Sequence, residues 1–176
     1  MKIKITLLLI IFFVSFALPV FSAPARWARP QYIKTYIPQK HRNAKMMKEA
    51  FSRWTKASNK NVKFYYVNNP KIAQITVHFV DVVPDHEWSV GLTERRISRR
   101  NHTLRSNIYI ASESHDGKIL SRDEVFTIML HEIGHALGLS HTRNKLSVMY
   151  PVEDVSQEIL PSDIKNLYRI YGLKAD

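Results

Sequence analysis

The stretch that decides the fold reads His131-Glu132-Ile133-Gly134-His135-Ala136-Leu137-Gly138-Leu139-Ser140-His141. On a helix, His131 and His135 share one face because they are four residues apart, so both imidazoles can bind one metal ion. Gly138 permits the left-handed turn that ends a helix and brings His141 back towards the same point. Three imidazoles with an open fourth position are the ligands of a catalytic zinc.

The carboxylate of Glu132 follows the first of these histidines, where it can reach a water molecule bound to the metal. A short His-Glu-x-x-His pattern also arises by chance on ordinary amphipathic helices. The added glycine and third histidine favour the metal site, because the longer pattern H-E-x-x-H-x-x-G-x-x-H is specific to one class of zinc enzymes. We therefore expect His131, His135 and His141 to bind one catalytic zinc.

Length and composition fit a single globular domain. The chain has 176 residues, 45% of them hydrophobic, which suffices for a sizeable core. It contains no cysteine. This excludes disulfides, thiolate metal ligands and a cysteine nucleophile.

The first residues predict export. A basic start precedes an apolar run from Ile5 to Leu18, and small residues follow that run. This is the layout of a signal peptide over residues 1–23, with cleavage near 22–25, followed by a mature domain over residues 24–176. The alternative is a membrane anchor, but the run is shorter than the roughly 20 apolar residues that span a bilayer. We expect a secreted or periplasmic protein.

The charge is strongly basic. Loss of Lys2 and Lys4 with the signal peptide leaves 24 basic residues against 15 acidic ones. Such a protein is drawn to anionic surfaces and polyanions. The sharpest cluster contains Arg95, Arg96, Arg99 and Arg100. Such a run of charges is usually a solvated loop, and recruitment of an anionic substrate or surface is the alternative interpretation. The lack of interleaved aromatic residues argues against specific nucleic-acid binding. No oligomeric state is predicted.

The remaining pattern predicts strands and helices of ordinary length. Strands are expected at 31–37, 62–67, 72–80 and 107–111, with a short edge strand at 90–93. Helices are expected over 43–57, from 121 to the signature glycine at 138, and from 162 to 172. Asn43, Ser121 and Ser162 are the expected caps, and Glu124 completes a capping box with Ser121.

A second motif, Ser147-Val148-Met149-Tyr150-Pro151, follows the histidines. Together the two motifs resemble the metzincin zinc peptidases, and within them the matrixins, the matrix-metalloproteinase group. Met149 stands where the family has its Met-turn methionine, an apolar floor beneath the zinc. Pro151 stands where the astacin and serralysin branches carry a zinc-facing tyrosine, which argues against those branches. Flanking stretches are also similar to matrixins, at 27–37, 50–54, 73–79 and 160–172.

The resemblance implies an α+β, zincin-like fold. This fold has a twisted, mostly parallel sheet with one antiparallel edge strand, two long helices and a small C-terminal helical subdomain. It implies a zinc endopeptidase acting on protein or peptide, with Glu132 as general base. The substrate would lie extended along the edge strand at Val90, Gly91, Leu92 and Thr93. Tyr150, Pro151 and Val152 would line the pocket for the residue after the scissile bond, with Thr127 at its back.

Three departures from the matrixin pattern narrow this expectation. The chain has no cysteine to cap the zinc, and no accessory domain is expected. Residues 84–86 and 108–110 lack the family's motifs for structural zinc and calcium, so we expect no structural zinc and find little support for Ca²⁺.

Two other functions stay open. One is a zinc-binding adhesion or envelope module without proteolysis, against which the intact Glu132 argues. The other is hydrolysis of an amide bond in cell-wall peptide, which the sequence does not exclude.

Overall fold

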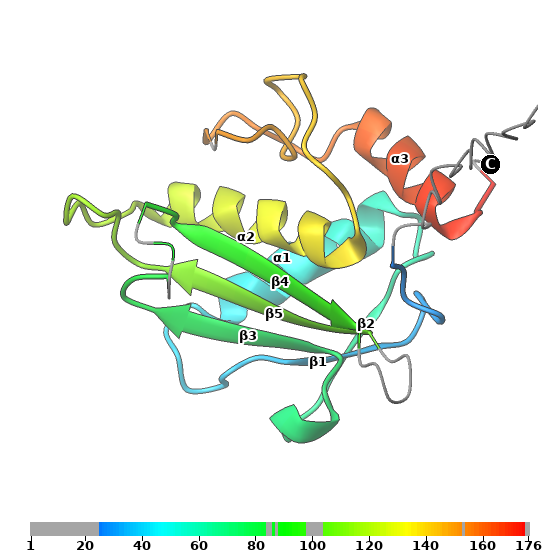
Figure 1. Ribbon diagram of the computed structural model, residues 1–176, viewed down its shortest axis with the longest axis horizontal. Coiled ribbons are helices and arrows are strands. Elements are labelled where there is room, and N and C mark those ends of the chain that lie inside the picture. The colour runs from blue at the N-terminus through cyan, green and yellow to red at the C-terminus, as the bar shows by residue number, and fades with distance from the viewer. Residues whose placement is uncertain (1–24, 84–85, 87, 98–103, 153, 175–176) are drawn as a thin grey trace, which may run out of the picture.

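The computed structural model describes residues 25–83, 86, 88–97, 104–152 and 154–174. The expected signal peptide, Arg99 and Arg100 lie outside these residues. The elements follow in the order β1 (Ile33–Tyr36), α1 (Ala44–Ala57), β2 (Phe64–Tyr66), the 3-10 helix η1 (Pro70–Ile72), β3 (Ile75–Val80), β4 (Gly91–Ile97), β5 (Leu104–Ala111), α2 (Arg122–Leu137) and α3 (Pro161–Tyr171) (Figure 1). In the part of the chain so described, no helix has the length and apolarity needed to cross a membrane.

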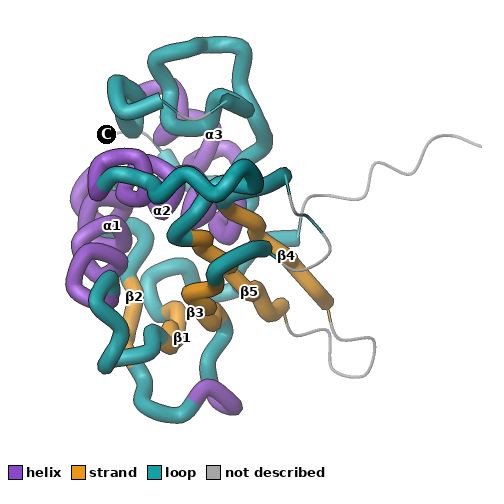
Figure 2. Tube along the Cα trace, turned by 90° about the vertical axis from the view of Figure 1, so that its left-hand side faces the viewer, coloured by secondary structure: helices purple, strands orange, loops and turns teal. Residues whose placement is uncertain are grey.

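One five-stranded sheet forms the base of the molecule, in the order β2-β1-β3-β5-β4. Neighbouring strands are parallel except β4, which runs antiparallel to β5 at one edge. The helices α1 and α2 lie on one side of this sheet, and α3 lies beyond the C-terminal end of α2 (Figures 1 and 2). The predicted fold class is therefore confirmed.

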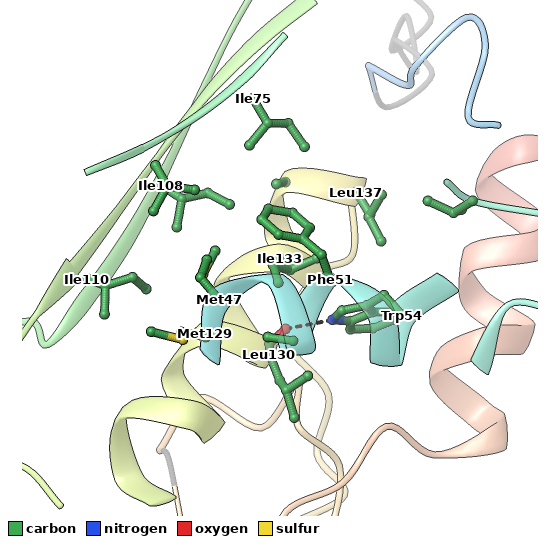
Figure 3. Close-up of a cluster of buried hydrophobic side chains, with 14 of the residues drawn as sticks. Met47, Phe51, Trp54, Ile75, Ile108, Ile110, Met129, Leu130, Ile133 and Leu137 are labelled. Carbon is green, nitrogen blue, oxygen red and sulfur yellow. Dashed lines mark hydrogen bonds between the residues drawn. The ribbon is translucent and has the colours of Figure 1, made fainter. Parts of the chain in front are cut away.

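The core lies between the sheet and the two long helices (Figure 3). The buried residues of α1 include Met46, Met47, Ala50, Phe51 and Trp54, and those of α2 include Val125, Ile128, Met129 and Ile133. Trp54 of α1 also donates its indole N–H to the main-chain oxygen of Leu130, at 2.9 Å. This bond fixes the position of α2 against α1. The side chains that meet there include Met47, Phe51, Trp54, Ile75, Ile108, Ile110, Met129, Ile133 and Leu137.

Both ends of α2 are capped, as predicted. The Ser121 hydroxyl accepts from the Glu124 amide at 3.2 Å, and the Glu124 carboxylate accepts from the Ser121 amide at 2.7 Å. Gly138 ends the helix with φ 101°, in the left-handed region that favours glycine. The helix that carries the signature is thus closed at each terminus by its own sequence.

The N-terminal segment is held against the C-terminal half of the chain. Arg26 donates to the main-chain oxygen of Ile170 at 2.9 Å, and the buried Trp27 donates to that of Ala136 at 3.0 Å. The Ala25 main-chain oxygen accepts from Arg95. These bonds join the segment to α2, α3 and β4.

Several predicted boundaries differ from the observed ones; for example, β5 begins at Leu104 and not at residue 107. The edge strand runs to Ile97, so Arg95 and Arg96 belong to β4 and not to a solvated loop. The start of the third predicted strand is instead η1, because the Asn69 side chain accepts from the Lys71 amide. Ser162 does not cap α3; the helix begins earlier because Pro161 fits its first position.

The true N-terminal bond of α3 comes from Asp163. Its carboxylate accepts from the Leu160 amide at 2.9 Å, which satisfies a donor that the helix itself cannot pair. The end of α3 at Gly172, with φ 65°, is as predicted.

Candidate metal centre and active site

The three signature histidines converge on one point. Their Nε2 atoms lie 2.9 Å apart for His131 and His135, 3.1 Å for His135 and His141, and 3.3 Å for His131 and His141. Nitrogens bound to one tetrahedral zinc at about 2.0–2.1 Å are separated by about 3.3 Å, so the spacing fits this ion. Across the described ranges, this is the only group of three or more ligand side chains close enough to share a metal.

Main-chain carbonyls fix the tautomers of two of these rings. The Nδ1 of His131 lies 2.6 Å from the oxygen of Val148, and the Nδ1 of His135 lies 2.9 Å from that of Leu139. A carbonyl oxygen only accepts, so each Nδ1 carries the proton and each Nε2 presents a lone pair to the centre. Lone pairs that face one another at this distance repel unless a cation lies between them. The site therefore fits a metal on its own chemistry.

Burial also keeps these rings neutral. It lowers the pKa of His135 to about 4, helped by the charge that a protonated His131 would carry. Burial is also the main cause of the lowered pKa of His131. Neutral imidazole is the form that binds metal, so His131 and His135 are ready to bind at neutral pH.

The Met-turn residue Met149 is buried, and its sulfur lies against Gly134 of α2. The Ser147 hydroxyl accepts from the Met149 amide at 2.9 Å and donates to the Asp163 carboxylate at 2.7 Å. Asp163 thus joins the Met-turn to the start of α3, a contact that the sequence analysis missed. No local pattern marks it, because the two side chains are 16 positions apart.

Gly134 is a further residue whose role the sequence analysis missed. A Cβ at this position would collide with the sulfur of Met149 and come within 3.1 Å of the Trp54 ring. Glycine inside a helix costs about 1 kcal/mol relative to alanine, so its presence is a signal of close approach. Here it lets the Met-turn pack directly against α2.

Glu132 lies between α2 and β4 and is only 3% exposed. The Thr93 hydroxyl is 2.6 Å from its Oε2 atom and 2.9 Å from its main-chain oxygen. Gly91 lies against the same side chain, since a Cβ there would come within 2.7 Å of the Glu132 Oε1 atom. Both residues were predicted to line the substrate cleft. Their side-chain positions face the helix, which leaves only their main chain for a substrate.

The predicted cleft residues do not all meet in one place. Val90 and Thr127 line one cavity of about 100 Å³ beside α2, and Thr127 also lines a larger one of about 460 Å³ next to Arg53 and Lys56. Tyr150, Pro151 and Val152 line neither cavity. Leu92 points to the opposite face of the sheet, paired with Tyr109 of β5.

The arginine cluster is divided by the alternation of the strand. Arg95 faces α2, where it bonds to Ala25 and lies near Gly138, and burial lowers its pKa. Arg96 faces outwards, is exposed, and pairs with Glu94 at 3.2 Å. Of the four arginines expected to attract anions, Arg95 therefore has a structural contact instead.

Comparison with known proteins gives one family. The Matrixin family pattern matches residues 30–172. A probable matrix metalloproteinase 095L of Invertebrate iridescent virus 3 is 27% identical over 142 residues, 73% of this chain and 37% of that protein. Stromelysin-2 of Rattus norvegicus is 37% identical over 59 residues, 31% of this chain and 12% of that protein. Matrix metalloproteinase-26 of Homo sapiens is 37% identical over 54 residues, 28% of this chain and 21% of that protein.

The chain spans less than half the length of each of these relatives. The family match, in contrast, covers nearly all of the described residues, including the helix of the three histidines and the Met-turn. Matrixins use a catalytic zinc, and the histidine triad is placed to bind such an ion. The chain belongs to the matrixin family.

Proposed function

We propose that this protein is a zinc-dependent endopeptidase in which His131, His135 and His141 hold the metal and Glu132 is the general base. One observation carries the proposal: three Nε2 atoms within 3.3 Å of one another, two of them with tautomers fixed by main-chain carbonyls. An adhesion module that only bound zinc would have no need of the buried carboxylate beside it.

The chain's own residues supply the remaining chemistry. When bound, zinc lowers the pKa of its water ligand and polarises a carbonyl oxygen. Glu132 accepts the proton of the attacking water and passes it to the leaving amine, a role for which carboxylates are common. Met149 provides the apolar floor of the site. The base and the ligands lie on one capped helix, which keeps their spacing constant.

The open edge of β4 is where we propose that the substrate binds. An extended peptide can add to such an edge through main-chain hydrogen bonds, as a further antiparallel strand. Its side chain after the scissile bond would enter the cavity shared by Val90 and Thr127. Tyr150, Pro151 and Val152, which do not line that cavity, would contact the same side chain outside it. Because Thr127 is small, we expect larger apolar residues to be accepted. A peptide-library profile tests this, and a preference for small residues would count against it.

We also propose that the chain is exported after removal of residues 1–23, and that residues 24–176 are one catalytic domain. Matrixins are typically secreted, which supports this location. The substrate is a protein or peptide. Arg96, with Arg99 and Arg100, is the proposed contact for anionic surfaces. N-terminal sequencing of the protein recovered outside the cytoplasm tests the cleavage site.

A casein or gelatin assay tests the function directly. We expect the wild type to cleave, and a chelator or the Glu132→Ala substitution to stop cleavage. Activity that survives Glu132→Ala would refute the mechanism. Binding to envelope material without turnover would support the adhesion module instead, and release of amines from cell-wall peptide without casein cleavage would support the amidase.

A further inference from the structure

The inner face of β4 contacts the proposed general base at two successive positions. Side chains alternate along a strand, so Gly91 and Thr93 face α2 together. Their partners on β5, Ile110 and Ile108, are buried core residues, which places this face of β4 towards the helices. Two neighbouring inner positions of the edge strand therefore lie against Glu132, 39 residues after Thr93 in the chain.

Thr93 makes a hydrogen bond of the strong kind to this carboxylate. Its hydroxyl has one proton and two acceptors in reach, the Glu132 Oε2 atom at 2.6 Å and the Glu132 main-chain oxygen at 2.9 Å. The shorter distance and the negative charge favour the carboxylate, because charge-assisted hydrogen bonds are shorter and stronger than neutral ones. The branched side chain of threonine also has few rotamers, so its hydroxyl is well placed.

Gly91 provides the space that this arrangement needs. A Cβ at position 91 would come within 2.7 Å of the Glu132 Oε1 atom and 2.9 Å of its Cγ atom. It would also come within 2.7 Å of Ile128. Any residue other than glycine would therefore displace the Glu132 side chain or the strand.

We propose that Thr93 and Gly91 are positioning residues for the general base: the hydroxyl holds one carboxylate oxygen, and the missing side chain leaves room for the other. This inference rests on the proposed role of Glu132. In the proposed function the substrate binds to the open edge of the same strand. One strand would therefore fix the position of Glu132 relative to the peptide bond. Proton transfer depends steeply on such geometry, and a misplacement of 1 Å can cost about a hundredfold in rate.

Kinetics with matched variants test the positioning role. Thr93→Val keeps the shape and removes the hydroxyl, and Thr93→Ser keeps the hydroxyl. We expect Thr93→Val to lower kcat on the order of ten- to a hundredfold, with KM and zinc content unchanged, and Thr93→Ser to restore most of the rate. Gly91→Ala should lower kcat in the same way.

Thr35→Val is the matched control. Thr35 is a fully buried threonine on β1 whose hydroxyl bonds to the main-chain oxygen of Ile33, and β3 and β5 separate its strand from β4. This variant should keep the kcat of the wild type. Wild-type kcat in Thr93→Val, or equal defects in Thr93→Val and Thr93→Ser, would overturn the inference.

A second measurement does not depend on activity. In a double-mutant cycle of Thr93→Val and Glu132→Ala, followed by thermal unfolding of the zinc-free protein, the two shifts in Tm should be non-additive. Additive shifts would show that the hydroxyl and the carboxylate do not interact, which also overturns the inference.

The two proposals fail in different ways. If the wild type cleaves casein and Glu132→Ala does not, the proposed function stands, and the Thr93 variants decide the inference alone. If Glu132→Ala remains active, the function as proposed and the positioning role fall together, whatever the double-mutant cycle gives.

Discussion

The helix α2 and the strand β4 face each other across Glu132, and they are held in different ways. The helix is capped at both ends, and most of its side chains are buried. The strand is paired with β5 along one edge only, and its exposure rises towards Ile97. The helix thus provides a fixed platform for metal ligands, whereas the strand combines fixed inner contacts with an edge that is open to a partner. In this site one element, α2, holds the ligands rigidly, and a different element, β4, is accessible to a substrate.

The largest expected effect comes from removing a metal ligand on α2. His135→Ala should abolish zinc binding and lower peptidase activity below detection, because two imidazoles do not complete the site. Elemental analysis of the purified protein should give one zinc per chain for the wild type and none for the variant. His78→Ala, on the outer face of the sheet where His78 stacks on Tyr109, is the matched control and should retain both. Two zinc ions per wild-type chain would point to a second, structural site.

The next largest expected effect is a loss of stability of the zinc-free protein at acidic pH, caused by His135 on α2. Burial lowers the pKa of His135 from 6.5 to about 4 in the folded protein. The unfolded chain therefore binds more protons between these values, and the zinc-free protein should lose stability as the pH falls from about 6.5 to about 4, by roughly 3 kcal/mol from this residue. Urea unfolding at a series of pH values measures this loss. A curve for His135→Gln with the same slope would contradict the assignment.

Packing of the Met-turn against α2 gives a smaller effect. Gly134→Ala gains helix propensity but forces a methyl group into the sulfur of Met149. We expect a net destabilisation of about 1–3 kcal/mol, as for other overpacked cores, measured by urea unfolding. Combining Gly134→Ala with Met149→Ala, which removes the sulfur, separates the clash from the other effects of losing the glycine. A Gly134→Ala protein as stable as the wild type would show that the turn can shift freely.

The smallest effects compare the two faces of β4. Arg95→Ala should cost about 1–2 kcal/mol, because it removes a partly buried side chain and its bond to Ala25. Arg96→Ala should change stability by less than about 0.5 kcal/mol, since its ion pair is exposed. Thermal unfolding of the two variants measures the difference. Equal shifts would mean that the strand is not divided into an inner and an outer face.

The contrast between α2 and β4 also explains which boundaries could be predicted from the sequence. The ends of α2 follow from bonds between residues three or four apart, so Ser121, Glu124 and Gly138 sufficed to place them. The end of β4 could not be predicted, because a run of arginines indicates a solvated loop unless a distant partner is known. For Arg95 that partner is Ala25, 70 residues away.

The candidate site divides in the same way. The histidine spacing is local, and it predicted which three rings would meet. The neighbours of Glu132 come from a strand that precedes it by 39 residues, and neither Gly91 nor Thr93 has a local pattern that announces the contact. Sequence motifs identified the metal ligands and the proposed base. The residues that hold the base in position could be identified only from the tertiary structure.

The hydrogen bonds of the N-terminal segment have a consequence for how the chain reaches its folded form. Arg26 bonds to the main chain 144 residues later, so this contact cannot form until α3 has been made. The segment from Ala25 to Trp27 therefore completes its contacts only after α3 exists, so the start of the described domain depends on its final helix.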